Sequence, residues 1–433
     1  MNSVWRESFE KRVSFAPLED NKSTEVLIIG GGIAGILCAY KLKSLGIDCI
    51  LAEAVEILGG ITGNTTAKIT LSHGLIYDKL IKGFGMEKAR LYLDAQMEAA
   101  GEYRKLCRDI DCDYDVKDSY VYSLSSIKKI EREIFALNTL GVKAEPSFAE
   151  ELPIDVVGAV RVKNQAEFHP LKFLYAIAGD LPIYEHTKIV ELKPNEAITD
   201  RGKISYKKLV VATHFPILNK HGGYFLKLYQ HRSYVIALKG AENLNGMYVD
   251  ESEKGLSFRN YKDLLLLGGG GHRTGKHGGC WQELEEFAKI YYPKAEIVAK
   301  WAAQDCMTLD GVPYIGKYSG STVDVFVATG FNKWGMTNAM VASSIISDLV
   351  IGRNNRYAEV FSPSRSILHP QLFLNAFEST VGLLTPTAPR CPHLGCALKY
   401  NRAEHTWDCP CHGSRFTESG TLIDNPATDD KKI

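Results

Sequence analysis

The chain has 433 residues, which is enough for two or three domains with hydrophobic cores of their own. Its 51 basic and 51 acidic side chains balance, so no nucleic-acid partner and no acidic, solvated tail are indicated. No apolar run approaches the roughly 18–20 residues of a membrane span, and the charged N-terminal segment lacks the apolar region of a secretory signal. We therefore expect a cytoplasmic protein.

Residues 24–53, TEVLIIGGGIAGILCAYKLKSLGIDCILAE, predict a strand, a glycine-rich turn, a helix and a second strand. Residues 26–29 form the continuous apolar run that is typical of a buried parallel strand. Residues 36–45 have helical apolar spacing and are followed by a glycine, as at many helix ends. A second apolar run, residues 49–52, leads into Glu53.

The turn between the first strand and the helix fits G-x-G-x-x-G, the pattern of a dinucleotide-binding loop. Gly30 permits the tight turn, Gly32 lets the backbone approach a pyrophosphate, and Gly35 lets the helix pack close to the strand. The helix N-terminus faces the phosphates, and Glu53 can accept hydrogen bonds from ribose hydroxyls. The residues that we assign to this site are Gly30, Gly32, Ile33, Ala34, Gly35, Glu53 and Ala54.

A second glycine-rich loop, GGITGNTTAKIT, follows shortly after the acid and favours FAD over NAD. It offers small side chains and hydroxyl donors where a flavin phosphate or ring edge can lie. A solvated polar loop is the alternative interpretation. The residues that we assign to the cofactor here are Gly59, Gly60, Thr62, Thr65, Thr66 and Lys68.

The middle of the chain predicts a substrate region. Residues 86–149 read mostly as helix, because apolar residues recur at three- and four-residue steps, whereas residues 224–271 read as strands of an antiparallel sheet. Arg232 or Arg259 can clamp a substrate carboxylate through two hydrogen bonds, or each can form a structural ion pair. His272 can act as a base near the flavin, or it can be a structural histidine.

Two later segments support a flavin. RGKISYKKLVVATHFP predicts a strand that leads into a turn over the adenine side of the cofactor. DVFVATGF and NKWGMTNAMVASSIISDLV predict a strand, a glycine-containing loop and a helix whose N-terminal dipole can face the flavin edge that becomes anionic on reduction. Trp334 is a further candidate on the substrate side. The residues that we assign to the cofactor are Ile189, Ala212, Thr213, Gly311, Gly330, Phe331, Gly335, Met336 and Thr337.

In this order, the fingerprint ending at Glu53, the GG-x-T loop, VVATH, DGVPYIG and VATGF resemble the D-amino-acid-oxidase-like flavoproteins, which include glycine oxidase and sarcosine oxidase. The resemblance covers residues 25–352 and implies an α/β (α+β) fold. It implies a discontinuous Rossmann-like FAD-binding domain and an antiparallel-sheet substrate domain that roofs the flavin. The expected ranges are 1–24 for an N-terminal arm, 25–85, 150–215 and 300–352 for the FAD domain, and 86–149 and 216–299 for the substrate domain.

Cys306 lies near the position at which sarcosine-oxidase-type relatives attach the flavin through a cysteine. Its spacing departs from that pattern, so we expect an unattached buried thiol. Covalent attachment is the alternative hypothesis.

Residues 353–385 read as a linker that contains one apolar, helical piece, QLFLNAFESTVGLL. Four of the ten cysteines then cluster in the segments RCPHLGC and CPCHGS. A zinc finger usually presents C-x2-4-C with H-x3-5-H, or paired C-x2-C knuckles. Here each segment offers one Cys and one His, which suits a two-iron cluster with thiolates on one iron and imidazoles on the other.

Both segments resemble the Rieske [2Fe-2S] motif, which we assign to a small all-β module at residues 386–433. Carried over, the iron ligands are Cys391, His393, Cys409 and His412. The two spare cysteines, Cys396 and Cys411, can form a disulfide that clips the two loops together. A typical Rieske domain has more strands before the first loop, so we expect these loops to lean on the flavoprotein body. Zinc is the alternative metal.

The combination predicts an FAD-dependent oxidoreductase with a Rieske cluster. We expect the C–N bond of an amine or amino acid to be oxidised by hydride transfer to FAD, and single electrons to pass through the cluster to an external acceptor. The alternatives are a reductase that runs in the opposite direction with an external electron donor, and a redox sensor or electron carrier without small-molecule turnover.

Overall fold

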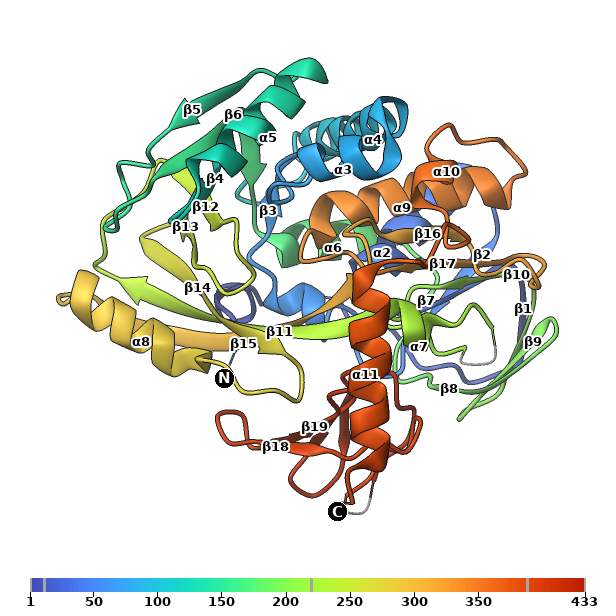
Figure 1. Cartoon of the computed structure of the whole chain (residues 1–433). Coiled ribbons are helices and arrows are strands. Elements are labelled where there is room, and N and C mark those ends of the chain that lie inside the picture. Colours follow the sequence, from blue (N-terminus) through green and yellow to red (C-terminus); the bar gives the residue numbers. More distant parts are fainter. Residues whose placement is uncertain (1, 11–12, 219–220, 387–388, 432–433) are drawn as a thin grey trace.

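The computed structural model describes residues 2–10, 13–218, 221–386 and 389–431. The predicted arm, substrate domain and cluster module therefore each include a few residues that lie outside the described ranges. The described chain forms three sheets, with helices packed against the two larger ones (Figure 1). The helices are α1 (Val4–Glu7), α2 (Ile33–Ser44), the 3-10 helix η1 (Ile61–Asn64), α3 (Tyr77–Phe84), α4 (Met86–Leu106), α5 (Ile127–Thr139), α6 (Pro170–Ala178), α7 (Tyr224–Lys227), α8 (Cys280–Tyr291), α9 (Gly335–Val350), α10 (Ala358–Phe361) and α11 (Pro370–Leu384).

The first sheet is the Rossmann-like one, with strand order β16-β17-β10-β1-β2-β7 and the hairpin β8–β9 beside β10. Its strands are β1 (Lys22–Ile29), β2 (Cys49–Ala52), β7 (Ile183–Tyr184), β8 (Ile189–Lys193), β9 (Glu196–Thr199), β10 (Lys203–Val211), β16 (Tyr314–Lys317) and β17 (Val325–Thr329). β1 pairs in parallel with β2 and β10, and β10 pairs in parallel with β17. The carboxyl ends of these strands therefore meet at one edge, from which α2 and α9 begin after glycine loops.

The second sheet has the order β15-β11-β14-β13-β12-β4-β6-β3, with β5 beside β6. Its strands are β3 (Lys68–Ile69), β4 (Asp115–Ser123), β5 (Ala144–Ser147), β6 (Gly158–Glu167), β11 (Leu228–Lys239), β12 (Gly246–Asp250), β13 (Ser257–Tyr261), β14 (Leu264–Arg273) and β15 (Glu296–Thr308). β11–β14 and β11–β15 are antiparallel, as predicted for the substrate region, whereas β12 and β4 pair in parallel.

The structure adds strands to two of the ranges predicted for the middle of the chain. Residues 86–149 contain the long helices α4 and α5, as expected, but they also contain the strands β4 and β5. The ranges 150–215 and 300–352, predicted for the FAD domain, contain β6 and most of β15, which belong to the second sheet. β6 joins this sheet because it pairs along its length with β4, a partner that a helical reading of residues 86–149 does not provide.

The third sheet forms the C-terminal module and is small and antiparallel (Figure 1). Its strands, in spatial order, are β18 (Lys399–Asn401), β19 (Thr406–Asp408), β20 (Arg415–Thr417) and β21 (Leu422–Asp424). The predicted linker is largely helical, and its apolar piece forms α11, as expected. α11 packs closely on the module, because a Cβ added at Gly382 would lie 2.6 Å from the Cys411 Sγ atom.

A buried charge network joins the module to the second sheet. The Glu404 carboxylate of the module accepts hydrogen bonds from Arg232 and Tyr234 of β11. Arg232 Nε and the Tyr234 hydroxyl each lie 2.9 Å from Glu404 Oε1. It also accepts a 2.8 Å hydrogen bond from Arg415, whose guanidinium pairs with Asp408 as well. The Arg232 and Glu404 side chains are only 5% and 8% exposed. A pair that is this well desolvated is costly to break from one side.

We predict that Glu404→Ala lowers the free energy of unfolding of the module by about 3–5 kcal/mol, because it leaves a buried guanidinium without its carboxylate. Urea unfolding of the cofactor-loaded protein measures this free energy, with the loss of cluster absorbance as the signal. Burial raises the pKa of Glu404, but the guanidinium groups of Arg232 and Arg415 outweigh burial and hold that pKa at about 2. The stabilisation should therefore persist above about pH 4.3, the unfolded value, and disappear as the pH falls through about 2.

The matched control is Glu418→Ala, which removes an exposed carboxylate contact of the same module. Glu418 pairs with His405, and both side chains are 60% exposed or more. An exposed pair contributes at most about 1 kcal/mol. Equal effects of the two substitutions would show that the Glu404 network does not hold the module.

Candidate cofactor sites

A cavity of about 970 Å³ lies between the Rossmann-like sheet and the second sheet. One wall consists of the loops at the carboxyl ends of β1, β2, β10 and β17, and the other of residues from β11, β14 and β15. Residues 422–425 of the C-terminal module also line it. A concave site of this size, walled by several elements, is typical of a cofactor and its substrate.

The glycine turn after β1 shows why small residues are required there. A Cβ added at Gly30 would lie 2.6 Å from the Ala212 carbonyl oxygen, and one at Gly35 would lie 1.9 Å from the Gly30 carbonyl oxygen. Gly30 also has a φ of 108°, which L side chains rarely adopt. At Gly32, by contrast, an added Cβ would meet only Thr62 Oγ1, at 3.5 Å, and would project into the cavity. The turn therefore leaves a cradle at the N-terminus of α2 that suits a pyrophosphate.

Glu53 lies at the cavity wall, at the end of β2. Its Oε2 accepts a 2.7 Å hydrogen bond from the Gly31 amide, and its Oε1 accepts a 3.0 Å hydrogen bond from the Val55 amide. Burial raises its pKa, and these backbone hydrogen bonds oppose that rise. A carboxylate has about four acceptor positions, so Glu53 retains capacity for the two hydroxyls of a ribose.

The second glycine-rich loop packs against the start of α2. Thr62 Oγ1 accepts a 3.1 Å hydrogen bond from the Ile33 amide, so the loop is tied to the first turn of the helix. Lys68 Nζ donates a 3.1 Å hydrogen bond to Thr66 Oγ1. Burial, together with the nearby charge of Arg259, lowers the pKa of Lys68 to about 7. A solvated polar loop, the alternative interpretation of this segment, does not agree with these buried contacts.

Most of the residues predicted for the cofactor line this cavity. They are Gly30, Gly32, Ile33, Ala34, Glu53, Ala54, Gly59, Gly60, Thr62, Thr65, Thr66, Lys68, Ile189, Ala212, Thr213, Gly311, Gly330, Phe331, Gly335 and Met336. Gly35 and Thr337 do not line it. Gly35 packs on Gly30, and the Thr337 hydroxyl lies 3.0 Å from the ring of His73.

Three of the four predicted catalytic side chains are engaged away from the cavity wall. Arg232 forms the ion pair with Glu404 of the module. Arg259 is 1% exposed and is held by the Glu167 carboxylate at 3.1 Å and by the carbonyls of the second glycine-rich loop. His272 lies 3.0 Å from the Tyr234 hydroxyl and 2.9 Å from the Arg273 carbonyl oxygen. For all three, the structural alternative agrees with the contacts, since each polar group already has a buried partner.

Trp334 is the predicted catalytic candidate that does line the cavity. It lies beside His73, a cavity residue that was not predicted from the sequence. Its ring stacks on His73, with centroids 5.0 Å apart. His73 also lines the cavity, and its Nδ1 lies 2.7 Å from the Tyr92 hydroxyl. Burial lowers the pKa of His73 to about 3, so its imidazole is neutral.

Lys333 and Asp305 are two further charged residues of the cavity wall that the sequence patterns did not reveal. Lys333 follows Asn332 in the loop between β17 and α9, and both have positive φ, 72° and 51°. Burial lowers the pKa of Lys333 and raises that of Asp305, and each opposes the shift of the other by its charge. The position of Lys333 within the predicted glycine-containing loop, next to the expected flavin edge, was the only feature of the sequence that indicated a charged residue on the cavity wall.

Cys306 lies on the cavity wall and is 2% exposed. Burial raises the pKa of its thiol to about 12. A protonated thiol is a poor nucleophile, which agrees with an unattached side chain rather than a covalent flavin link.

The two cysteine–histidine loops of the module have the same backbone geometry. The Cys391 amide donates to the Cys396 carbonyl and the Cys409 amide donates to the Ser414 carbonyl, both at 2.8 Å. In each loop a glycine amide also donates back to the cysteine that begins the loop, at 2.9 Å. The loops therefore present their side chains as a matched pair on one end of the small sheet.

The side chains of these loops form the donor set predicted for a Rieske cluster. The rings of His393 and His412 lie 5.0 Å apart, and the Cys391 thiol is hydrogen-bonded to Cys409. That contact lowers the pKa of Cys391 to about 7. Burial lowers the pKa of His393 to about 4 and that of His412 to about 3, so both rings are neutral, as metal binding requires.

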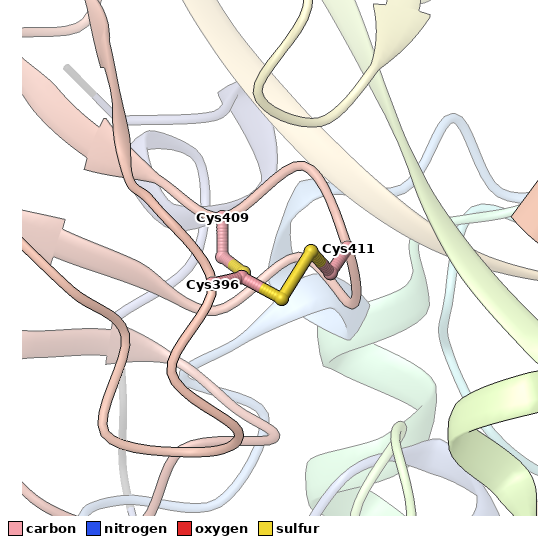
Figure 2. A group of neighbouring side chains, drawn as sticks. All are labelled: Cys396, Cys409 and Cys411. Atoms are coloured by element: carbon pink, nitrogen blue, oxygen red, sulfur yellow. A yellow bond between two sulfur atoms is a disulfide. The ribbon is translucent and has the colours of Figure 1, made fainter. Parts of the chain in front are cut away.

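A disulfide joins Cys396 to Cys411, as the resemblance to Rieske proteins implied (Figure 2). The sulfur of Cys409 lies within 4.8 Å of both disulfide sulfurs. This group of three cysteines is not itself a metal site, because two of the three sulfurs are already bonded to each other. The thiols that remain for iron are Cys391 and Cys409.

The cluster loops pack against the flavoprotein body, as expected from the small number of strands in the module. Gln304 of β15 donates a 2.9 Å hydrogen bond to the Gly413 carbonyl, and Arg273 of β14 donates to the carbonyls of Pro410 and Cys411. A Cβ at Gly275 would lie 2.6 Å from the Pro410 nitrogen, so the two backbones are in close contact. The module is therefore packed onto β14 and β15 at its cluster end.

Comparison with known proteins decides the family. Residues 25–349 match the family model DAO, described as FAD dependent oxidoreductase, and residues 374–432 match the Rieske [2Fe-2S] domain. The chain belongs to the DAO family of FAD-dependent oxidoreductases. It carries a C-terminal Rieske domain, so its cofactors are FAD and a [2Fe-2S] cluster. Within the described residues, no helix is both long and apolar enough to cross a membrane.

Three similar proteins agree with this assignment. YhfW of Bacillus subtilis (strain 168), whose name describes a Rieske 2Fe-2S iron–sulfur protein, is 34% identical over 96% of this chain and 94% of its own. Gamma-glutamylputrescine oxidoreductase of Escherichia coli (strain K12) is 21% identical over 82% of this chain and 90% of its own. The structure of glycine oxidase from Geobacillus kaustophilus superposes with a TM-score of 0.68 at 17% identity, covering 80% of this chain and all of that one. This last likeness confirms the predicted fold.

We predict that Gly32→Val folds but loses most of its FAD, because the added side chain enters the cradle at the start of α2 without a backbone clash. Flavin absorbance per chain after purification measures this. Gly101→Val is the control, since a Cβ at Gly101 in α4 meets nothing within 4 Å and Gly101 does not line the cavity. Wild-type flavin content in Gly32→Val would contradict the assignment of the cradle.

Proposed function

We propose that this oxidoreductase oxidises the C–N bond of an amine or amino acid and sends the electrons, one at a time, through its Rieske cluster to an external acceptor. The observation that carries the proposal is the shared cavity. Its walls come from the glycine turns, from the second sheet and from residues 422–425 of the Rieske module. One chamber is thus bounded by both redox domains of the chain.

The roles proposed for the FAD-binding residues follow from their positions in the cavity. The Gly30–Gly32 turn and the N-terminus of α2 hold the pyrophosphate, and Glu53 accepts hydrogen bonds from the ribose. The amides at Gly335 and Met336, at the start of α9, direct the positive end of that helix at the flavin. When bound, FAD supplies the hydride acceptor, and the cluster supplies a one-electron carrier.

The substrate class is inferred from the relatives and from the cavity wall. Gamma-glutamylputrescine oxidoreductase and glycine oxidase are named for an amine and an amino acid, respectively. Because Arg232 and Arg259 are held in ion pairs, we assign the recognition of an anionic substrate group to Lys333. Trp334, stacked on His73, then forms an aromatic wall that orients the substrate and excludes water.

Anaerobic spectroscopy with a panel of amines and amino acids tests the proposal. We expect at least one compound to bleach the flavin absorbance and then to produce the signal of the reduced cluster. In Cys391→Ser, which removes a cluster ligand, the same compound should bleach the flavin without a cluster signal. If no amine, amino acid or hydroxy acid bleaches the flavin of iron-replete protein, the proposed reaction is wrong.

A further inference from the structure

A single short segment, Thr213–Phe215, reaches from the cavity wall to the cluster histidines. It directly follows β10 and Ala212, and the His214 carbonyl accepts a hydrogen bond from Thr329, the last residue of β17. Because the loop expected to face the flavin edge begins after Thr329, the segment extends from the predicted adenine side to the flavin end of the cavity. Thr213 and His214 line the cavity, and the next residue, Phe215, is 1% exposed. The Phe215 ring lies edge-on to both cluster histidines, with centroid distances of 6.3 Å to His393 and 6.2 Å to His412. Adjacent residues of one chain therefore contact the two cofactor sites.

The Rieske module itself fixes this segment in place. Asn425 Nδ2 donates hydrogen bonds to the Thr213 carbonyl at 2.5 Å and to the Phe215 carbonyl at 2.7 Å. The ring of His214 is held as well, because its Nε2 lies 3.0 Å from Gln230 Oε1. Gln230 in turn packs on the second cluster loop, since a Cβ added at Gly413 would lie 2.2 Å from Gln230 Cγ. The segment is thus clamped from the module and from β11.

The His412 ligand of the cluster faces the flavoprotein body, whereas His393 is half-buried. His412 is 3% exposed, and its ring packs against Phe215 and Phe225, both of which belong to the body. An electron donor from outside the chain cannot reach this ring without displacing the body. Electron transfer through bonded and closely packed groups is also faster than transfer across a gap, which favours the segment as the route.

We propose that electrons pass between the FAD and the cluster of the same chain along Thr213–Phe215, with Phe215 as the positioning residue that couples the histidine ligands to the cavity wall. The inference rests on the proposed function because it uses both cofactors. It adds the route of the electrons and states that the FAD and the cluster that exchange them belong to the same chain. Each crossing moves one electron. It leaves the flavin one electron more oxidised and converts one of the two Fe(III) ions of the cluster to Fe(II). A one-electron acceptor then reoxidises the cluster, so two crossings remove the electron pair of one hydride, and the proton of that hydride is released to solvent.

The test is flash photoreduction of the flavin in loaded protein, with the rise of the reduced-cluster signal as the readout. In Phe215→Leu, which keeps an apolar side chain but removes the ring between the histidines, we expect this rise to slow several-fold. The matched control is Phe225→Leu, because the Phe225 ring lies against His412, one of the two cluster histidines, and Phe225 is not in the segment. We expect the control to keep the wild-type rate, and both variants to keep the wild-type midpoint potential and electron paramagnetic resonance spectrum after chemical reduction. An unchanged rate in Phe215→Leu would overturn the inference.

A second variant covers the case in which Phe215→Leu does not hold the cluster. Asn425→Asp keeps the size of the side chain but replaces the amide donor with an acceptor that faces the Thr213 and Phe215 carbonyls. The segment should then shift away from the module, and the crossing rate should fall while the cluster remains. A wild-type rate in a loaded Asn425→Asp protein would contradict the route.

One sample that mixes two variants tests whether the transfer is within one chain. Cys391→Ser, which holds flavin without cluster, is co-expressed with Gly32→Val, which holds cluster without flavin. We expect no rapid cluster reduction in the mixture, and we expect the wild-type rate to be independent of protein concentration. Rapid reduction in the mixture would show transfer between chains. Because light reduces the flavin without a substrate, failure of the amine screen and failure of this test are separate results.

Discussion

The buried carboxylate of Glu404, held between Arg232 and Arg415, is the contact on which the two-cofactor arrangement depends. The module has four short strands and a small apolar core, so it buries little surface by itself. Its cluster end is completed by the backbone and side chains of β14 and β15. The Glu404 ion pairs and the close backbone contacts with β14 and β15 therefore support the cluster loops. They take the place of the additional strands that a larger Rieske domain would provide.

That docking also decides what each side of the cluster faces. The ring of His412 is covered by the flavoprotein body, whereas Leu394, in the other loop, is 43% exposed. The module thus presents one face to the cavity wall and another to solvent. A cluster with this placement suits a relay between an internal electron source and an external acceptor.

The sequence predicted most of the features that depend on local backbone geometry. The strand, glycine turn and helix at residues 24–53 are set by short-range sterics, as the near contact between Gly35 and Gly30 shows. The Rieske loops were predictable for the same reason, since the ligands and their spacing lie within single turns of the chain. β4 was missed because its apolar pattern is weaker than that of the helices around it, and its strand character depends on pairing with β6 and β12.

The partners of the charged residues could not be predicted, because they are distant in sequence. Arg232 pairs with Glu404, which lies 172 residues away, and no local pattern distinguishes that use from a substrate clamp. Arg259 of β13 and Glu167 of β6 are likewise far apart in the chain, and their ion pair depends on how the strands of the second sheet are arranged. Conversely, Lys333 looked like an ordinary loop lysine until the fold placed it on the cavity wall.

Quantifying FAD, iron, acid-labile sulfide and zinc in the purified protein measures whether a single chain holds both redox cofactors. We expect about one FAD, two iron ions and two sulfides per chain, with an electron paramagnetic resonance signal of a reduced [2Fe-2S] cluster after dithionite. Zinc in place of iron, or iron without FAD in intact protein, would contradict this expectation.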